Sequence, residues 1–441
     1  MNVVLISPPM HPKIERDIMR MVPPLGVYTL AGVLDRTGHN VEVYDHQSLL
    51  DIYDDSWDLE CIKELVSDAQ VVGISTNSFN WGMSKDLINI IKSFSKPPYV
   101  VCGGIHPTFF DTHILEVSKA DAVISGEGEA NILKLVNALE KGCSLDDIPN
   151  IIYRQNGQIH KNNILIPKTF VDYGIPAYDM IPEKTYYNIP VETSRGCCFH
   201  CEFCSILDAH NWRGLDAETS IKRMNEAAKF VNKNSVFNSI FIVDNCFTAD
   251  IKRATDILSE ICSQKSTYTI HFESRCTDIL KSREFLDSML PSRISTIQIG
   301  IECGYDEGLM RIKKGLRIKD VEECLIMLQS KDLAKKAMLS FMIGFPWEKA
   351  DDCIKTIEFA KYLEGKYKSV VGVNWWMPLK SPLLDKSKQY GFSFGEDIYD
   401  DPLWTRNMDF IKSVYASLTI KDIQYLSQRY SNTVTNLTEM V

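Results

Sequence analysis

Residues 194–204 read SRGCCFHCEFC and place four cysteines within eight residues. Three of them, Cys197, Cys201 and Cys204, form a CxxxCxxC pattern where a short apolar strand is expected to end. Three thiolates on one loop can hold three corners of an iron–sulfur cube. No fourth cysteine lies nearby in the sequence, so one iron would stay open to another ligand. An open iron supports chemistry as well as electron storage.

Two other interpretations of these cysteines remain. A zinc site would need a fourth ligand, such as His200 or His210, and usually begins with a C-x2-C pair. The cysteines could also be ordinary buried side chains. Neither alternative explains the spacing, which favours a cluster.

Strands and helices alternate after this segment. Counted from the strand that leads into the cysteines, there are about six βα units, too few for a full eight-unit barrel but enough for a partial one with an open side. The expected strands lie at 187–194, 239–245, 268–275, 295–302, 337–346 and 369–378. We therefore predict a partial barrel over 189–380 and a mostly helical region over 381–441.

The first 150 residues show a different arrangement of the same elements. Apolar runs at 2–7, 41–45, 71–75, 99–104 and 122–129 alternate with amphipathic segments, which is typical of a doubly wound, Rossmann-like α/β sheet. Ligands of such sheets bind outside the carboxyl ends of the strands. Residues 151–188 form a connecting segment in which Asn156-Gly157 predicts a hairpin.

Composition limits the classes of partner. The formal net charge of -10 gives no reason to expect nucleic acid. No run of about 18 apolar residues predicts a transmembrane helix, and the start MNVVLISPPM lacks the features of a signal peptide. Nine further cysteines are scattered singly, as expected of small buried side chains in a reducing compartment. We expect a cytoplasmic protein.

The cysteine segment resembles the signature of the radical S-adenosylmethionine (SAM) superfamily, including the aromatic residue before the last cysteine. In that family SAM chelates the open iron of a 4Fe–4S cluster, and its reductive cleavage gives methionine and a 5′-deoxyadenosyl radical. The segments IVDNCF (242–247), IGIECG (299–304) and MIGFPWE (342–348) resemble later motifs of the family, in the same order. Two departures are Cys198, where proline is common, and Lys380-Ser381, where Gly-Thr is common.

The resemblance assigns roles in SAM binding. Asp244 or Asn245 would meet the methionine amino group, and Glu302 would lie near the ribose. Glu273 and Arg275 could reach the same ligand. The full set of candidate SAM-binding residues is Phe203, Asp244, Asn245, Glu273, Arg275, Glu302 and Gly344, the last to let the backbone approach the adenine.

The N-terminal segments ISPPM, VVGIST, VCGGIHPTFF and AVISGEGE resemble the cobalamin-binding domain that is fused to many radical SAM enzymes. The D-x-H-x-x-G motif of cobalamin mutases is absent, because Asp45-His46 are adjacent, and we expect no histidine ligand to cobalt. An alternative is a domain that kept its fold and lost the cofactor. The candidate cobalamin-binding residues are Ser7, Ser75, Thr76, Gly103, Gly104, His106, Gly126 and Glu127.

Together these features predict a cobalamin-dependent radical SAM methyltransferase that acts on an unactivated carbon of a small-molecule or lipid-like substrate. It would receive electrons from a donor such as flavodoxin or ferredoxin. An alternative is a radical SAM enzyme for ring formation, ring contraction, dehydration or oxidation without methyl transfer. A third possibility, from another class, is a metal or cobalamin carrier without catalysis.

Overall fold

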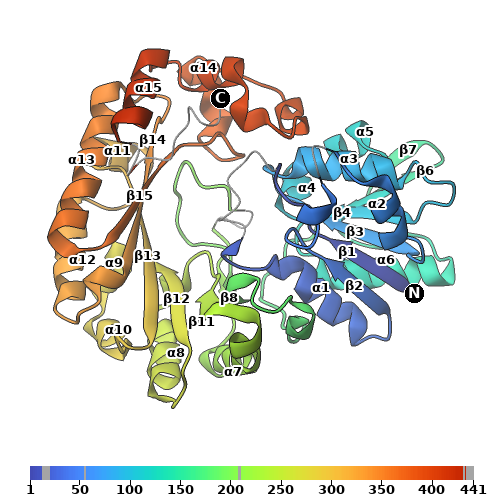
Figure 1. Cartoon of the computed structure of the whole chain (residues 1–441), viewed down its shortest axis with the longest axis horizontal. Coiled ribbons are helices and arrows are strands. Elements are labelled where there is room, and N and C mark those ends of the chain that lie inside the picture. Colours follow the sequence, from blue (N-terminus) through green and yellow to red (C-terminus); the bar gives the residue numbers. More distant parts are fainter. Residues whose placement is uncertain (12–19, 54–55, 207–209, 431–432, 434–441) are drawn as a thin grey trace. The chain divides into compact units, whose positions relative to one another are not determined.

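The computed structural model describes residues 1–11, 20–53, 56–206, 210–430 and 433. The chain divides into two compact units (Figure 1). The first comprises Met1–Tyr187, Lys233–Val236 and Gly395–Trp404. The second comprises Asn188–Asn232, Phe237–Phe394 and Thr405–Val441.

A seven-stranded sheet with the order β2-β1-β3-β4-β5-β6-β7 forms the first unit. The first five strands in this order are parallel, and a hairpin extends the edge in antiparallel fashion. The hairpin turn is at Asn156-Gly157, where it was predicted. The strands are β1 (Asn2–Ile6), β2 (Asn40–Tyr44), β3 (Val71–Ser75), β4 (Tyr99–Gly103), β5 (Ala122–Ile124), β6 (Ile151–Gln155) and β7 (Gln158–Lys161).

The strand order of this sheet reverses between β1 and β3, which is the point where ligands bind in open α/β sheets. Buried apolar side chains make up most of the parallel strands, as expected where helices cover both faces. The covering helices are α1 (Leu25–Asp35), α2 (Leu59–Leu65), α3 (Trp81–Ile91), α4 (Ile105–Phe109), α5 (Asp111–Val117) and α6 (Glu129–Lys141), with short 3-10 helices at η2 (Leu50–Ile52) and η3 (Tyr178–Met180).

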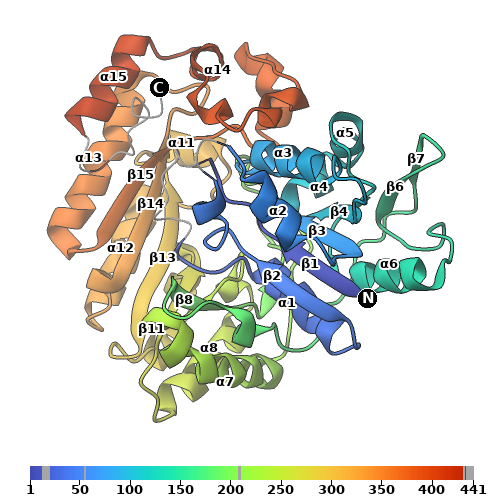
Figure 2. The same ribbon diagram turned by 45° about the vertical axis from the view of Figure 1, so that its right-hand side comes forward.

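The second unit contains a six-stranded sheet with the order β15-β14-β13-β12-β11-β8. Strands β11 to β15 pair in parallel, and the sheet curls with its helices on the outer side (Figure 2). The sheet does not close on itself, because β8 and β15 are its two edges. The strands are β8 (Tyr186–Val191), β11 (Ser235–Ile242), β12 (Thr269–Ser274), β13 (Ile294–Glu302), β14 (Ala337–Ile343) and β15 (Val370–Trp375).

Alternate positions of these strands face the helices or the concave side. Phe272 of β12 packs near the helical residue Phe285 and is fully buried, whereas its neighbour Glu273 points to the opposite face. The helices are α7 (Ala217–Asn234), α8 (Ile251–Ser263), α9 (Cys276–Lys281), α10 (Arg283–Ser288), α11 (Asp306–Arg311), α12 (Ile318–Gln329) and α13 (Ala350–Tyr367), with 3-10 turns at η4 (Phe247–Ala249) and η5 (Ala334–Lys336). The predicted fold class, a Rossmann-like sheet followed by a partial barrel, is confirmed.

The last sixty residues contain α14 (Met408–Val414) and α15 (Ile420–Arg429) after the 3-10 helices η6 (Leu384–Tyr390), η7 (Glu396–Asp400) and η8 (Trp404–Arg406). The segment Gly395–Trp404 packs within the first unit. There Asp400 accepts a hydrogen bond of 2.6 Å from the indole of Trp81 in α3, and Trp404 donates one of 3.0 Å to the Ser78 carbonyl. In the described part of the chain, no helix combines the length and apolar character needed to cross a membrane.

Candidate functional site

The cysteine loop is closed by a clip of two short strands, β9 (Ser194–Arg195) and β10 (Arg213–Gly214), which pair antiparallel just beyond β8. The loop between them carries all three cysteines of the CxxxCxxC pattern, each partly buried, whereas Cys198 is exposed. The clip thus presents the three thiols at the carboxyl end of the first strand of the half-barrel, where ligands of such barrels bind.

Hydrogen bonds to sulfur prepare two of these thiols as ligands. The Phe199 N–H donates to Cys197, and the Ile206 N–H donates to Cys204. The pKa of Cys197 is lowered to about 6 despite its burial. The causes are a hydrogen bond from Cys246, the bond from the Phe199 N–H, and the positive charges of Arg275 and Lys314. Burial instead raises the pKa of Cys204 to about 11. Such backbone bonds to sulfur are typical of iron–sulfur ligands, so the donor set fits a cluster.

Within the described residues, no three His, Cys, Asp or Glu side chains converge on one point as ligands of a single metal ion. The thiolates of an iron–sulfur cube bind three different irons and therefore do not meet at one point. The loop is also anchored by Glu202, whose N–H donates to the Ile312 carbonyl at 3.0 Å and whose carboxylate pairs with Lys313 and Lys386.

Two cations lie beside the cysteines. The Arg275 guanidinium lies 3.7 Å from the Phe199 ring centroid and places Nη1 3.7 Å from Cys201 Sγ. Its Nη2 donates to the main-chain carbonyl of Lys314, whose ammonium lies 5.7 Å from the Phe203 ring centroid. These charges favour thiolates over thiols. Sequence reasoning identified Arg275 but missed Lys314, for which the only signal was a Lys-Lys-Gly sequence between two helices.

Lys314 forms a buried ion pair with Glu302, with 2.8 Å between Nζ and Oε1. Burial disfavours the ammonium, yet the pKa of Lys314 is raised because the carboxylate favours its charged form. Glu302 itself has a positive φ of 79°, and the pairing of β13 with β14 shifts register beside it. A non-glycine residue in this left-handed region is strained, and such strain persists where surrounding contacts hold the residue in place.

Glu273 of β12 lies beside this pair on the concave face. It is the register partner of Gln298 in β13, whose amide donates to its carboxylate at 3.1 Å. Burial and the nearby Glu302 and Asp244 raise the pKa of Glu273 to about 7, although Lys314 opposes the shift. The structure thus brings together Arg275, Glu273 and Glu302 from the predicted SAM-binding set.

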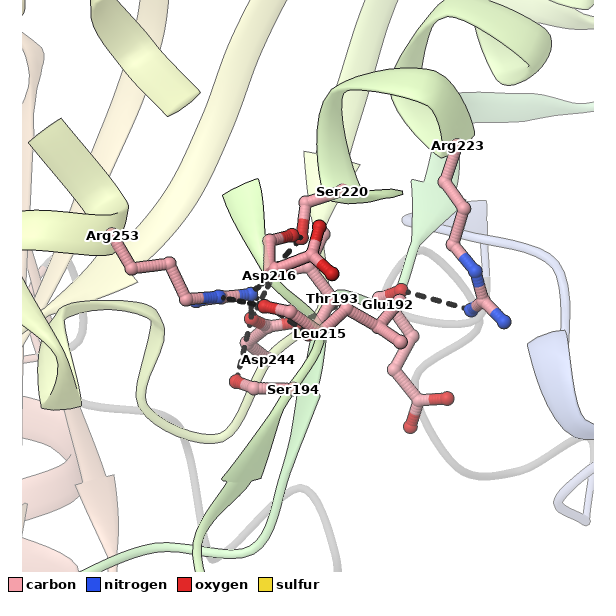
Figure 3. A network of polar contacts seen from close by, with 9 residues as sticks. All are labelled: Glu192, Thr193, Ser194, Leu215, Asp216, Ser220, Arg223, Asp244 and Arg253. Atoms are coloured by element: carbon pink, nitrogen blue, oxygen red, sulfur yellow. Dashed lines mark hydrogen bonds and ion pairs between the residues drawn. The ribbon is translucent and has the colours of Figure 1, made fainter. Parts of the chain in front are cut away.

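Asp244 and Asn245 have different environments. The Asp244 carboxylate is buried and accepts hydrogen bonds of 2.6 Å from the Thr193 N–H, the Thr193 hydroxyl and the Ser194 hydroxyl (Figure 3). Its acceptor capacity is therefore largely used within the protein. Asn245 is exposed in the segment that follows β11 and is the better placed of the two for an external ligand.

Gly344 follows β14 with a φ of 79°, and a Cβ there would lie 2.7 Å from the Trp375 ring. Packing within the protein therefore requires glycine here, independently of any ligand. Phe203 lies in an edge-on contact with Phe345, at 6.2 Å between centroids. Glu348 supports this turn, since its buried carboxylate accepts from the Phe345 N–H at 3.0 Å.

In the first unit, the candidate cobalamin-binding residues lie at the carboxyl ends of adjacent strands. Ser75 and Gly103 are register partners in β3 and β4, and the Thr76 N–H donates to the Gly103 carbonyl at 2.9 Å. Gly104 has a φ of 104°, and a Cβ there would lie 2.5 Å from the Thr76 carbonyl oxygen. Ser7 follows β1, and Gly126 and Glu127 follow β5. Small residues at a strand-end edge leave room for a bulky ligand, so the edge fits cobalamin.

His106 is fully buried in the same unit, between the rings of Trp81 and Phe110 and against Tyr399. One ring nitrogen lies 2.9 Å from the Ser78 hydroxyl. Burial lowers the pKa of His106 to about 3, so the ring is neutral at physiological pH. It is held as a packed core side chain.

Comparisons with known proteins support both units. The model of the radical SAM superfamily matches residues 191–360, and that of the B12 binding domain matches 18–136. An uncharacterised methyltransferase of Pyrococcus horikoshii is 30% identical over 83% of this chain and 79% of its own length. The anaerobic magnesium-protoporphyrin IX monomethyl ester cyclase of Rubrivivax gelatinosus is 23% identical, covering 89% of this chain and 70% of its own.

A solved structure shares the fold. The radical SAM methyltransferase TsrM from Kitasatospora setae, with cobalamin and a 4Fe–4S cluster bound, has a TM-score of 0.67 at 16% identity, covering 88% of this chain and 75% of that chain. The half-barrel with its three-cysteine loop defines a radical SAM enzyme. With its second matched domain, the chain belongs to the family of cobalamin-dependent radical SAM enzymes, whose cofactors are a 4Fe–4S cluster, SAM and cobalamin.

Proposed function

We propose that the protein transfers a methyl group to an unactivated carbon of a small-molecule or lipid-like substrate. The observation that carries the proposal is the combination, in one chain, of a radical SAM half-barrel with a B12-binding unit. The relative from Pyrococcus horikoshii that spans both is named as a methyltransferase.

When bound, the cofactors supply reductive cleavage of SAM and a methyl group carried by cobalamin. Cys197, Cys201 and Cys204 would hold the cluster through their thiolates. Arg275 and Lys314 would balance its negative charge from one side, as their contacts with the loop support. The curled sheet would keep water away from the reacting atoms.

We assign SAM contacts on the concave face of the barrel. Asn245 would bind the methionine amino group, because the Asp244 carboxylate is already taken up by hydrogen bonds. Glu302, fixed by Lys314, would bind the ribose hydroxyls. Glu273, whose pKa is near 7, can hold a proton at its carboxyl group close to neutral pH. Phe203 and Gly344 remain predicted contacts.

We assign the cobalamin to the strand-end edge of the first unit, with Ser7, Ser75, Gly103 and Gly126 admitting its bulk. The burial of His106 supports binding without an imidazole ligand to cobalt, because this side chain is enclosed by aromatic rings. Thr76 contributes its backbone, since its hydroxyl donates to Asn80 at 2.7 Å. Gly104 and Glu127 complete the proposed set.

We infer that a small reductase protein, such as a flavodoxin or ferredoxin, supplies electrons. We also infer a cytoplasmic location, because free thiols and an oxidant-sensitive cluster need a reducing compartment.

The test is an anaerobic incubation of reconstituted protein with SAM, a reductant and candidate acceptors. Methyl transfer predicts S-adenosylhomocysteine and 5′-deoxyadenosine in comparable amounts. Cys201→Ala should abolish 5′-deoxyadenosine, whereas Cys198→Ala, a matched control at an x position of the CxxxCxxC pattern, should retain it. Turnover without S-adenosylhomocysteine contradicts methyl transfer.

The same assay tests a second candidate function. The relative from Rubrivivax gelatinosus that matches 89% of this chain is named as a cyclase, which supports radical ring formation without methyl transfer as the second candidate. Its mark is 5′-deoxyadenosine and an altered substrate with no S-adenosylhomocysteine.

A further inference from the structure

A buried arginine joins both ends of the cysteine loop. Arg253 lies in the first turn of α8 with a side chain that is 6% exposed. Its Nε donates to the Leu215 carbonyl at 2.6 Å and its Nη2 to the Thr193 carbonyl at 2.7 Å (Figure 3). Thr193 immediately precedes β9 and Leu215 immediately follows β10. One guanidinium therefore holds the entry and the exit of the loop that carries the cysteines.

The Asp244 carboxylate binds the same end of the cysteine loop, at Thr193 and Ser194. Its three hydrogen bonds fix the backbone and hydroxyl of Thr193 and the hydroxyl of Ser194. Its carboxylate also lies 3.7 Å from Arg253 Nη2, which offsets the cost of burying the guanidinium. We call Arg253, Asp244 and Thr193 the loop clamp.

The loop clamp is close to the first cysteine along the chain. Only three residues, 194–196, separate Thr193 from Cys197. A displacement of Thr193 therefore also displaces the Cys197 thiol, because so short a segment cannot absorb it. The Leu215 N–H also donates to the Thr193 carbonyl at 3.0 Å, which draws the two ends of the loop together. The Trp212 and Phe247 rings lie 5.7 and 5.9 Å from the guanidinium and shield it from water.

Arg293 offers a matched comparison in the same half-barrel. It is equally buried and donates to two main-chain carbonyls, those of Tyr268 at 3.0 Å and Gln264 at 2.8 Å. It immediately precedes β13 and so lies at the amino ends of the strands, away from the loop. The two arginines make similar contacts and differ in what those contacts hold.

We propose that Arg253 is a positioning residue for the iron–sulfur cluster, holding the ends of the cysteine loop at the separation that lets its thiolates bind a cube. This inference rests on the proposed function for the presence of the cluster. It assigns to Asp244 a role in the loop clamp.

The experiment compares Arg253→Met with Arg293→Met in the full chain. The first readout is amide hydrogen exchange of peptides covering 194–215 before reconstitution. The second is iron and sulfide per chain after anaerobic reconstitution. We expect Arg253→Met to speed exchange in this segment at least about tenfold and to lose most of the iron, while Arg293→Met matches the wild type in both.

A wild-type value for Arg253→Met in either readout overturns the proposal. If that variant does not fold, Thr193→Val replaces it. It removes the hydroxyl that donates to Asp244 and accepts from Arg253, but keeps both main-chain bonds of Thr193, so it should show smaller changes in the same direction. A wild-type chain that takes up no iron would refute the proposed function. The exchange readout then decides the loop clamp alone, with faster exchange supporting it and unchanged exchange overturning it.

Discussion

Replacing Lys314 by methionine removes the cation that pairs with Glu302. The two charged atoms are 2.8 Å apart, and the side chains are 9% and 8% exposed. At an effective dielectric constant of about 20, their attraction is about 6 kcal/mol. Part of this offsets the cost of burying both charges, and loss of one partner of a buried pair typically costs about 3–5 kcal/mol. We expect Lys314→Met to lower the free energy of unfolding of the second unit by that amount.

The matched control is Lys313→Met, one residue earlier in the chain. Lys313 is 60% exposed and pairs with Glu202, which keeps a second partner in Lys386. Because the Lys313 ammonium is exposed and the buried Glu202 carboxylate keeps Lys386, loss of this pair should cost less than about 1 kcal/mol. Urea unfolding at pH 8, followed by circular dichroism, measures both variants, with the free energy taken from the step that they shift.

A double variant completes this prediction. In Lys314→Met/Glu302→Gln, the carboxylate that loses its partner in the single variant is also neutral, so at least half of the lost stability should return. If Lys314→Met costs no more than Lys313→Met, or the double variant recovers nothing, the buried ion pair does not have the role that its geometry indicates.

Three further substitutions test other parts of the structure. Glu273 has a pKa raised to about 7, so folding takes up a proton between about pH 4.5 and 7, and the free energy of unfolding falls as pH rises through this window. In urea unfolding, Glu273→Gln should therefore be more stable than the wild type by about 1–3 kcal/mol at pH 8 and equally stable at pH 4. Gly344→Ala should cost about 1–3 kcal/mol, because its φ is positive and its Cβ would meet an indole ring at 2.7 Å, whereas Gly365→Ala, with nothing within 4 Å, should cost nothing. Asp400→Ala removes the carboxylate that accepts the Trp81 indole N–H of α3 at 2.6 Å, and should speed amide hydrogen exchange in 395–404. Unchanged exchange would contradict the packing of this segment against α3.

The elements with strong local patterns could be predicted from the sequence. Buried parallel strands such as β3 and β4 are short apolar runs, and the turn at Asn156-Gly157 needs only its own two residues. The cysteine spacing likewise predicted the superfamily. Contacts between distant parts of the chain could not be predicted, because no local pattern encodes them. The packing of η7 against α3 joins segments more than three hundred residues apart.

Residues of the candidate site that belong to a local motif could be predicted, whereas their distant partners could not. Glu302 was chosen from its motif, but its partner Lys314 lies on the far side of α11 and has no distinctive neighbours. Asp244 was predicted to contact SAM, whereas its carboxylate accepts hydrogen bonds from Thr193 and Ser194, which follow the preceding strand of the barrel. A motif residue can serve the protein's own structure, and only the fold shows which acceptors are already used. The assigned contacts to SAM and cobalamin stay predictions.

The central claim is that one chain binds both a radical SAM cluster and cobalamin. Anaerobic reconstitution with iron, sulfide and hydroxocobalamin, followed by metal analysis, tests it directly. The account predicts about four irons and about one cobalt per chain, with the iron lost and the cobalt kept in Cys201→Ala. A chain that binds iron and retains no cobalt would contradict the account and favour radical chemistry without methyl transfer.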